Sequence, residues 1–175
     1  MVVHKGKTIF VGDTSVHEYP TSEQMAEIAI STARVVRLFG FEPKVAFVSH
    51  STFGQPLTSR TKHIRKAVDI LKDKKVDFEF DGDMQPDVAL NAEYEELYPF
   101  SKIVGKANIL IMPGQHSAAI SYKMMKTLGG TKVIGPLLIG LGLPIEIAPL
   151  RSSTSELINL ASIAAYSADI IDYKK

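Results

Sequence analysis

A cluster of hydroxyl side chains begins at the last residue of the apolar segment 44–49. Ser49, Ser51 and Thr52 supply the hydroxyl groups, and Gly54 lets a ligand approach the backbone closely. Hydroxyls and backbone amides arranged in this way bind phosphate groups. The segment is therefore a candidate phosphate cradle, although a polar loop between a strand and a helix is the commoner explanation of such a stretch.

A candidate acid or base, His116, lies in a second polar segment, residues 113–117, which follows the apolar run 108–112. Imidazole titrates near neutral pH and can accept or donate a proton there. A histidine that only forms hydrogen bonds in a surface loop is the commoner case. The sequence assigns His116 no carboxylate partner.

Two more candidate anion sites lie further along the chain. Gly135 and Pro136 precede the apolar run 137–139, and a proline in the first turn of a helix would leave backbone amides facing an anion. A buried packing turn explains this pair equally well. Arg151 lies beside a predicted helix start at Ser153, where an arginine can clamp phosphate or carboxylate. The alternative is an ordinary helix cap with an exposed arginine.

Composition excludes several classes of function. The 175 residues carry 20 basic and 19 acidic side chains, so we expect neither nucleic acid nor a membrane surface as partner. The basic run 60–66 fits the solvated face of a helix. The absence of cysteine excludes disulfides and thiolate chemistry and fits a cytoplasmic location. The longest apolar stretch, 133–143, is too short to span a bilayer.

No motif predicts a metal or a nucleotide cofactor in this chain. Asp81, Asp83 and Asp87 lack the ligand spacing of a calcium loop, and Asp81-Gly82 is typical of a turn. The chain contains no phosphate-binding P-loop and no G-x-G-x-x-G. Four histidines lack metal-like pairing: His4, His17, His50 and His63.

Strand-like and helix-like segments alternate along the chain. Capping boxes at Thr21 and Ser153 mark two helix starts, and Gly40 ends the first helix. Apolar runs and helical periodicity predict strands at 8–11, 44–49, 76–80, 108–112 and 144–148, and helices at 21–40, from 58, at 117–128 and from 153. The inner face of the last helix is predicted to comprise Leu157, Leu160, Ala161, Ala164, Ala168 and Ile171.

This alternation predicts one α/β domain over residues 1–175, with a mostly parallel sheet covered on both faces. Ligands of open α/β sheets bind outside the carboxyl ends of the strands, beside helix N-termini. The four candidate segments all follow this rule.

Several segments together resemble the phosphate acetyl/butyryltransferase family. Residues 80–90 (FDGDMQPDVAL) resemble its D-G-E-[LM]-x-x-D-A-A-[LI] motif, and 104–113 (VGKANILIMP) resemble G-x-A-N-[IV]-L-[IV]-x-P. The N-terminal stretch 8–47 and the F-G pair after the hydroxyl cluster are nearer to the version appended to hybrid malic enzymes. The remaining matches are 45–54, 120–123 and 135–141.

The resemblance implies a three-layer α/β/α fold like that of the isocitrate and isopropylmalate dehydrogenases. It also implies a homodimer or a larger assembly. A complete acyltransferase of this family has two lobes and about twice this length, so residues 1–175 would be its C-terminal lobe.

The resemblance also identifies departures at the last helix. Active members carry a serine and an arginine before this helix, and an aspartate about seven residues after that serine. Here Leu150 stands at the serine position, Arg151 is retained, and Leu157 stands at the aspartate position. Acyl transfer needs an activated thiol and a stabilised oxyanion. The resemblance therefore implies a domain that no longer transfers acyl groups.

We accordingly expect a regulatory and oligomerising domain of a malic enzyme, with acetyl-CoA or CoA as effector. NADP and Mg or Mn are expected only in a longer parent chain. The alternative is a phosphate acetyltransferase represented by its C-terminal half. The candidate ligand-binding residues are Ser49, Ser51, Thr52, Gly54, His116, Gly135, Pro136 and Arg151, with no catalytic or metal-binding residue.

Overall fold

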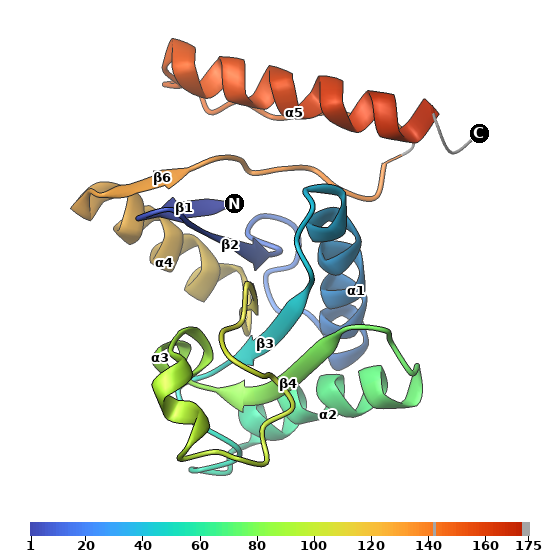
Figure 1. Cartoon of the computed structure of the whole chain (residues 1–175), viewed down its shortest axis with the longest axis vertical. Helices are drawn as coiled ribbons and strands as arrows, with labels where there is room; N and C mark the ends of the chain where they lie inside the picture. Colours follow the sequence, from blue (N-terminus) through green and yellow to red (C-terminus); the bar gives the residue numbers. More distant parts are fainter. Residues whose placement is uncertain (142, 173–175) are drawn as a thin grey trace.

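The centre of the molecule is a six-stranded sheet in the order β4-β3-β5-β2-β1-β6 (Figure 1). The computed structural model describes residues 1–141 and 143–172, with side chains through residue 168. The strands are β1 (Val2–His4), β2 (Lys7–Gly12), β3 (Lys44–Val48), β4 (Glu79–Met84), β5 (Ile109–Ile111) and β6 (Thr131–Val133).

The sheet is mixed and mostly parallel. β3 pairs in parallel with β4 and β5, and β5 pairs in parallel with β2. β1 is antiparallel to both β2 and β6, so β6 runs in the same direction as the parallel strands. The sequence does not predict β1 and β6, because a three-residue strand is too short to show a period.

Alternating residues of β3 build two hydrophobic cores, one on each face of the sheet. Val45 and Phe47 pack with Met25 of α1 (Ser22–Leu38) and Ile64 of α2 (Ser59–Asp73). Ala46 and its neighbours pack on the opposite face, in a cluster that also contains Val48, Met84, Ala89, Ile103, Ala107 and Leu110. Strands buried on both faces explain why these runs are continuously apolar.

Helices cover both faces of the parallel half. Figure 1 shows α1 (Ser22–Leu38) and α2 (Ser59–Asp73) on one side of the sheet, and α3 (Pro86–Leu90) and α4 (Gln115–Leu128) on the other. A short 3-10 helix, η1 (Ala92–Glu95), follows α3. The predicted capping box at Thr21 is confirmed. The α/β fold is thus confirmed, and its likeness to the isocitrate dehydrogenases stays a prediction.

The predictions around β4 are wrong in two respects. The strand begins at Glu79 rather than at residue 76, and it continues through Asp81-Gly82, which the sequence predicts as a turn. Asp81 is buried, and its carboxylate accepts hydrogen bonds from the backbone N–H groups of Gly82 and Lys102. These bonds offset the cost of burying an acidic residue inside a sheet.

The C-terminal third differs most from expectation. No helix begins at Pro136, and the predicted strand 144–148 is reduced to a single bridge between Leu137 and Glu146. The last helix, α5 (Thr154–Asp172), starts at the predicted cap, where the Ser153 N–H donates to Glu156 Oε2 at 2.8 Å.

The prediction of the inner face of α5 is mostly wrong. Figure 1 shows that this helix lies apart from the sheet, so most of its apolar side chains are not buried against it. Leu160 is buried, whereas Leu157 and Ala161 are exposed and Ala164 and Ala168 are half-buried. The side chain of Ile171 lies outside the described residues. Among the helices of residues 1–141 and 143–172, none has the length and apolarity needed to cross a membrane.

Candidate functional site

The loop after β3 is tied to the end of β4. The Ser51 hydroxyl donates a hydrogen bond to the carboxylate of Asp83, and the Phe53 N–H donates to the Asp83 carbonyl at 2.6 Å. The Gln85 N–H donates to Thr52 Oγ1 at 3.2 Å. Ser51 and Thr52 are buried, so their hydroxyls hold the loop in place rather than face solvent. Ser49 is also buried, and its hydroxyl makes only long contacts of 3.4–3.5 Å, with His50 and Ser51.

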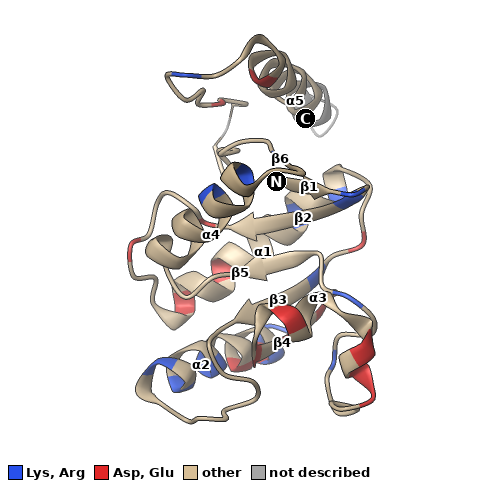
Figure 2. Ribbon diagram, turned by 90° about the vertical axis from the view of Figure 1, so that its left-hand side faces the viewer, with Lys and Arg blue, Asp and Glu red and all other residues tan. Residues whose placement is uncertain are grey.

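A basic side chain that the sequence assigns to a solvated helix face lies against this loop. A Cβ placed on Gly54 would be 2.7 Å from Nη1 of Arg65, so the guanidinium lies directly against the backbone of this loop. Figure 2 shows Lys and Arg residues along α2, the helix that carries Arg65. The loop therefore has a cation beside its backbone, and the pairing with position 54 is visible only in three dimensions.

His116 lies at the start of α4, beside the loop that follows β2. Its Nε2 is 3.3 Å from Glu18 Oε1, and its ring stacks on Tyr19 with centroids 6.0 Å apart. The Arg60 guanidinium lies over the ring of Tyr19, with its Cζ 5.8 Å from the ring centroid. The structure thus supplies the carboxylate partner that the sequence does not assign, on an exposed surface.

The topology brings the Ser49 loop and His116 to a switch point of the sheet. β3 and β5 are neighbours, yet the chain leaves β3 through α2 on one face and leaves β5 through α4 on the other. Oppositely directed connections open a crevice at the carboxyl ends of two adjacent strands, and ligands of open α/β sheets bind there.

The remaining candidates form a second group at the far side of the sheet. Gly135 and Pro136 follow β6, four strands from β3, which corresponds to about 19 Å at the usual strand spacing. Gly135 and Ser152 line the same narrow crevice, and Ser152 adjoins the exposed Arg151. The eight predicted residues therefore divide into two groups along one edge.

The serine and aspartate that accompany this arginine in active family members are replaced by Leu150 and Leu157, so neither position gives Arg151 a polar partner. Leu150 is fully exposed, and the side chain of Leu157 is 47% exposed. Glu156, next to Leu157, pairs with Lys126 at 2.6 Å and closes the cap of α5. The hydrogen bonds from Lys126 and Ser153 lower the pKa of Glu156 to about 2. The carboxylate of Glu156 therefore stabilises the start of α5.

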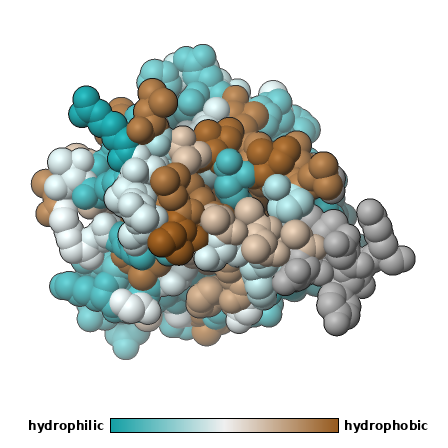
Figure 3. Space-filling model, turned by 90° about the horizontal axis from the view of Figure 1, so that it is seen from above, coloured by the Kyte–Doolittle hydropathy of each residue, from teal (hydrophilic) through white to brown (hydrophobic). Residues whose placement is uncertain are grey.

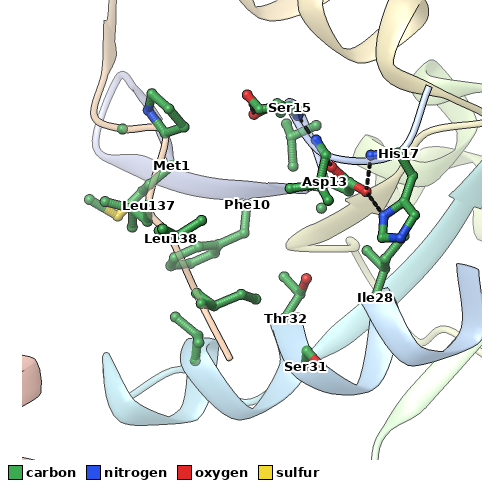
Figure 4. A pocket seen from close by; sticks show the side chains of 18 of the residues that line it. Met1, Phe10, Asp13, Ser15, His17, Ile28, Ser31, Thr32, Leu137 and Leu138 are labelled. Carbon is green, nitrogen blue, oxygen red and sulfur yellow. Dashed lines mark hydrogen bonds and ion pairs between the residues drawn. The ribbon is translucent and has the colours of Figure 1, made fainter. Parts of the chain in front are cut away.

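A cavity of about 700 Å³ opens between the end of β2, α1 and residues 134–139 (Figure 4). Asp13 and His17 lie at one end, with Asp13 Oδ2 and His17 Nδ1 2.5 Å apart. Burial raises the pKa of Asp13, but hydrogen bonds from backbone N–H groups and from His17 outweigh it, so the net pKa lies below its usual value. Sequence reasoning missed this pair, although the D-x-x-x-H spacing after an apolar strand was an available signal.

Within the described part of the chain, no three His, Asp or Glu side chains gather closely enough to hold a metal ion. The features above define an open-sheet α/β protein whose polar loops gather along the carboxyl edge of the sheet. Residues 1–165 match the model of the phosphate acetyl/butaryl transferase family, and the chain belongs to this family.

Relatives from two kinds of protein share this sequence. The chain is 51% identical to the NADP-dependent malic enzyme of Rhizobium meliloti (strain 1021), over 94% of this chain and 22% of that protein. It is 33% identical to the phosphate acetyltransferase of Bacillus subtilis (strain 168), over 95% of this chain and 52% of that protein. The chain therefore spans about a fifth of the first relative and about half of the second.

Solved structures agree with this assignment. The EutD phosphotransacetylase from Staphylococcus aureus superimposes with a TM-score of 0.86 at 29% identity, covering 95% of this chain and 52% of that one. A phosphotransacetylase from Streptococcus pyogenes gives 0.83 at 33% identity, with 90% and 48% coverage.

Proposed function

We propose that the chain is the regulatory and oligomerising C-terminal domain of an NADP-dependent malic enzyme, and that it binds acetyl-CoA or CoA without transferring the acyl group. Residues 1–175 then correspond to the C-terminal lobe of a phosphotransacetylase-like module within a longer parent. The 51% identity to the R. meliloti malic enzyme, confined to 22% of that protein, supports this reading.

One observation carries the proposal. Arg151 is retained beside the start of α5, but Leu150 and Leu157 stand at the serine and aspartate positions of the family pattern. The nearby Glu156 is paired with Lys126. An arginine binds phosphate through charge-assisted hydrogen bonds. Thiol activation, by contrast, needs a base, and a leucine supplies none. The chemistry present is that of binding.

The parent reaction, oxidative decarboxylation of malate to pyruvate, requires NADP and a divalent cation such as Mg or Mn. The described residues hold neither a cluster of three metal-binding side chains nor a G-x-G-x-x-G loop. In this proposal both groups bind to the part of the parent outside this sequence.

The two groups of candidate residues suit an extended ligand with phosphates. CoA carries phosphates at its nucleotide end and a long neutral arm at the other. Arg65 beside Gly54 and Arg151 beside α5 place a guanidinium in each group. Anionic oxygens are favoured at helix N-termini and beside arginine.

The exposed apolar surface around α5 supports the proposed self-association. Leu150, Ile158 and Ile147 are at least half exposed, and Figure 3 shows hydrophobic residues gathered on the face seen from above. Contiguous exposed apolar surface of this kind marks interaction sites. We propose that this face, which also includes Leu143, Ile145 and Leu157, packs in a homodimer or larger assembly.

The experiment combines three readouts on the purified protein and on a malic enzyme that contains this domain. Calorimetric titration with acetyl-CoA should show saturable binding, and acetyl-CoA should change the malate-dependent reduction of NADP. Acetyl phosphate should not form from acetyl-CoA and phosphate. Saturable binding without any effect on malate kinetics contradicts the regulatory role.

The alternative is a phosphate acetyltransferase represented by its C-terminal half. The 33% identity to the B. subtilis enzyme over 52% of its length favours it. Formation of acetyl phosphate that is lost in Arg151→Ala would establish this alternative and overturn the first proposal.

A further inference from the structure

An exposed aromatic patch lies beside β4, the edge strand of the parallel half of the sheet. It comprises Phe53, Leu57, Leu97, Tyr98 and Phe100. The ring of Phe53, in the loop after β3, lies 5.4 Å from that of Tyr98 and 4.8 Å from that of Phe100, measured between centroids. Phe100 is 63% exposed, and Leu97 and Leu57 are 67% and 57% exposed. Grouped exposed apolar side chains of this kind mark a surface that contacts another molecule.

Acidic side chains lie on one side of the aromatic patch. The segment 91–101 carries Glu93, Glu95 and Glu96 and no basic residue, and all three glutamates are exposed. The next residue along the chain, Leu97, belongs to the patch. Within the described part of the chain, none of the three glutamates forms an ion pair with a lysine or arginine. Their negative charge is therefore available to a partner.

Basic side chains of α2 lie on the other side of the aromatic patch. The Arg65 guanidinium and Leu57 both lie against Gly54, since a Cβ there would be 2.7 Å from Arg65 Nη1 and 3.5 Å from Leu57 Cδ1. Lys62, one helical turn before Arg65, shares its face of the helix. Both cations are exposed, and neither forms an ion pair with a described residue. Figure 2 shows Lys and Arg residues on α2, and Asp and Glu residues in the segment that follows α3.

A surface with this layout is complementary to a second copy of itself. Rotation by a two-fold axis through the aromatic patch places the acidic side of each copy against the basic side of the other and brings the two sets of aromatic rings together. An apolar centre with a charged rim is the usual anatomy of a protein interface. A partner of uniform charge, by contrast, would be attracted by one side of the patch and repelled by the other. The charges therefore favour a second copy of this chain.

We propose that the aromatic patch is a two-fold interface between two copies of this chain, in which Glu95 and Glu96 of each copy face Lys62 and Arg65 of the other. This interface is separate from the apolar face of α5. Residues of α5 and β6 line one crevice, and β6 and β4 are the opposite edges of the sheet. Two different two-fold contacts at opposite edges can join four copies. The inference goes beyond the proposed function and requires neither CoA binding nor the α5 contact.

The first test measures molar mass in a Leu157→Glu background, which disrupts the α5 contact. Size-exclusion chromatography with light scattering should show a dimer, and its mass should stay at two copies as the concentration rises, because a two-fold contact closes on itself. A protein that remains a monomer at every concentration overturns the proposal. A mass that keeps growing with concentration contradicts the two-fold geometry.

Two charge-reversed variants of this background give a sharper test. Glu95→Lys with Glu96→Lys gives both sides of the patch a net positive charge, and Lys62→Glu with Arg65→Glu makes both sides acidic. Each variant alone should be a monomer, because like charges face each other across the interface. An equal mixture should restore a dimer of one copy of each, since opposite charges then meet on both sides. A mixture that stays monomeric, with both variants folded by circular dichroism, overturns the proposal.

Matched controls test the centre and the rim of the patch separately. Phe100→Ala should raise the dissociation constant of the dimer about tenfold or more, as expected for an aromatic side chain at the centre of an interface. Leu128→Ala truncates a side chain that is 81% exposed at the end of α4 and should leave the constant unchanged. Arg34→Glu reverses a charge on the exposed face of α1 and should leave the dimer intact. Equal effects of Phe100→Ala and Leu128→Ala contradict the proposal.

The same measurements separate this interface from the proposed contact through α5. If the wild type is a dimer and Leu157→Glu is a monomer, the α5 contact stands and the aromatic patch is not an interface. If Leu157→Glu does not change the mass and both charge-reversed variants dissociate, the aromatic patch stands and the α5 contact falls.

Discussion

The hydroxyl of Ser51 donates a hydrogen bond to the carboxylate of Asp83, and neither side chain is exposed to solvent. The other carboxylate oxygen of Asp83, Oδ1, is buried without a partner. This pair connects the loop after β3 to the end of β4. A buried carboxylate with one side-chain donor makes that donor costly to remove.

We expect Ser51→Ala to destabilise the fold. Loss of the hydroxyl leaves a buried acceptor unsatisfied, which lowers the free energy of unfolding by about 1–3 kcal/mol. The control Ser59→Ala, at an exposed position of α2, should change it by about 0.5 kcal/mol or less. Urea denaturation measures both, and equal effects would show that the Ser51–Asp83 bond contributes nothing.

Gly82 and Gly105 provide a second comparison. Both have positive φ, 149° and 81°, so an alanine is strained at either position, by about 1–2 kcal/mol in a left-handed conformation. A Cβ on Gly82 would also lie 2.6 Å from the carbonyl oxygen of Phe47, whereas one on Gly105 meets no atom within 4 Å. We therefore expect Gly82→Ala to be clearly more destabilising than Gly105→Ala in thermal unfolding. The reverse order contradicts the packing of β3 against β4.

The pKa of Asp13 predicts a pH dependence of stability. Burial raises this pKa, but hydrogen bonds from Val16, His17 and Ser15 lower it to a net value below the usual 3.8. A carboxylate with a lowered pKa stabilises the fold above its unfolded pKa, and this contribution is lost as the pH falls through the folded pKa. Asp13→Asn should therefore lose less stability than the wild type on acidification below about pH 4. Parallel urea denaturation curves at pH 3 and pH 7 measure this difference, and identical losses contradict it.

Arg151→Ala tests the proposed effector site. Hydrogen bonds to charged groups contribute about 1.5–3 kcal/mol, so acetyl-CoA should bind about tenfold or more weakly. Arg34→Ala removes an equal charge from the exposed face of α1 and should leave affinity unchanged. Calorimetry compares the two variants, and unchanged affinity in Arg151→Ala removes this residue from the site.

Leu157→Glu tests the proposed assembly. The side chain of Leu157 lies on the exposed apolar face of α5, and a charge there would be buried without a partner in an interface. We expect a shift toward smaller species in size-exclusion chromatography with light scattering. Ser155→Glu adds the same charge in the first turn of the same helix and should leave the distribution unchanged, and an unaltered mass for Leu157→Glu excludes this face.

Local patterns predicted the parallel half of the fold well. The apolar runs at β3 and β5 and the cap of α1 are all found where the sequence places them. Buried parallel strands are apolar on both faces, and helix caps use short-range bonds, so both leave a mark within a few residues. Asp81-Gly82 was mispredicted because one of the backbone N–H groups that hold the Asp81 carboxylate inside the strand belongs to Lys102, 21 residues further along the chain.

The candidate site was only partly accessible to the same reasoning. The sequence predicts which loops follow the strands, and the sheet places those loops on one edge. It does not predict Arg65 beside Gly54, because that contact depends on how α2 packs against the loop. It also assigns no partner to His116, since Glu18 lies 98 residues away along the chain.

By itself, the sequence determined the class of the fold, the starts of α1, α2 and α5, and the family, because hydrophobic period, capping residues and short motifs are properties of neighbouring residues. Only the tertiary structure decided that Ser51 serves the loop through Asp83, that Asp13 and His17 stand at the end of an apolar cavity, and that Arg151 lies across the sheet from Ser49. The order of strands and the packing of helices set those relationships, and both depend on contacts between segments that are distant in the chain.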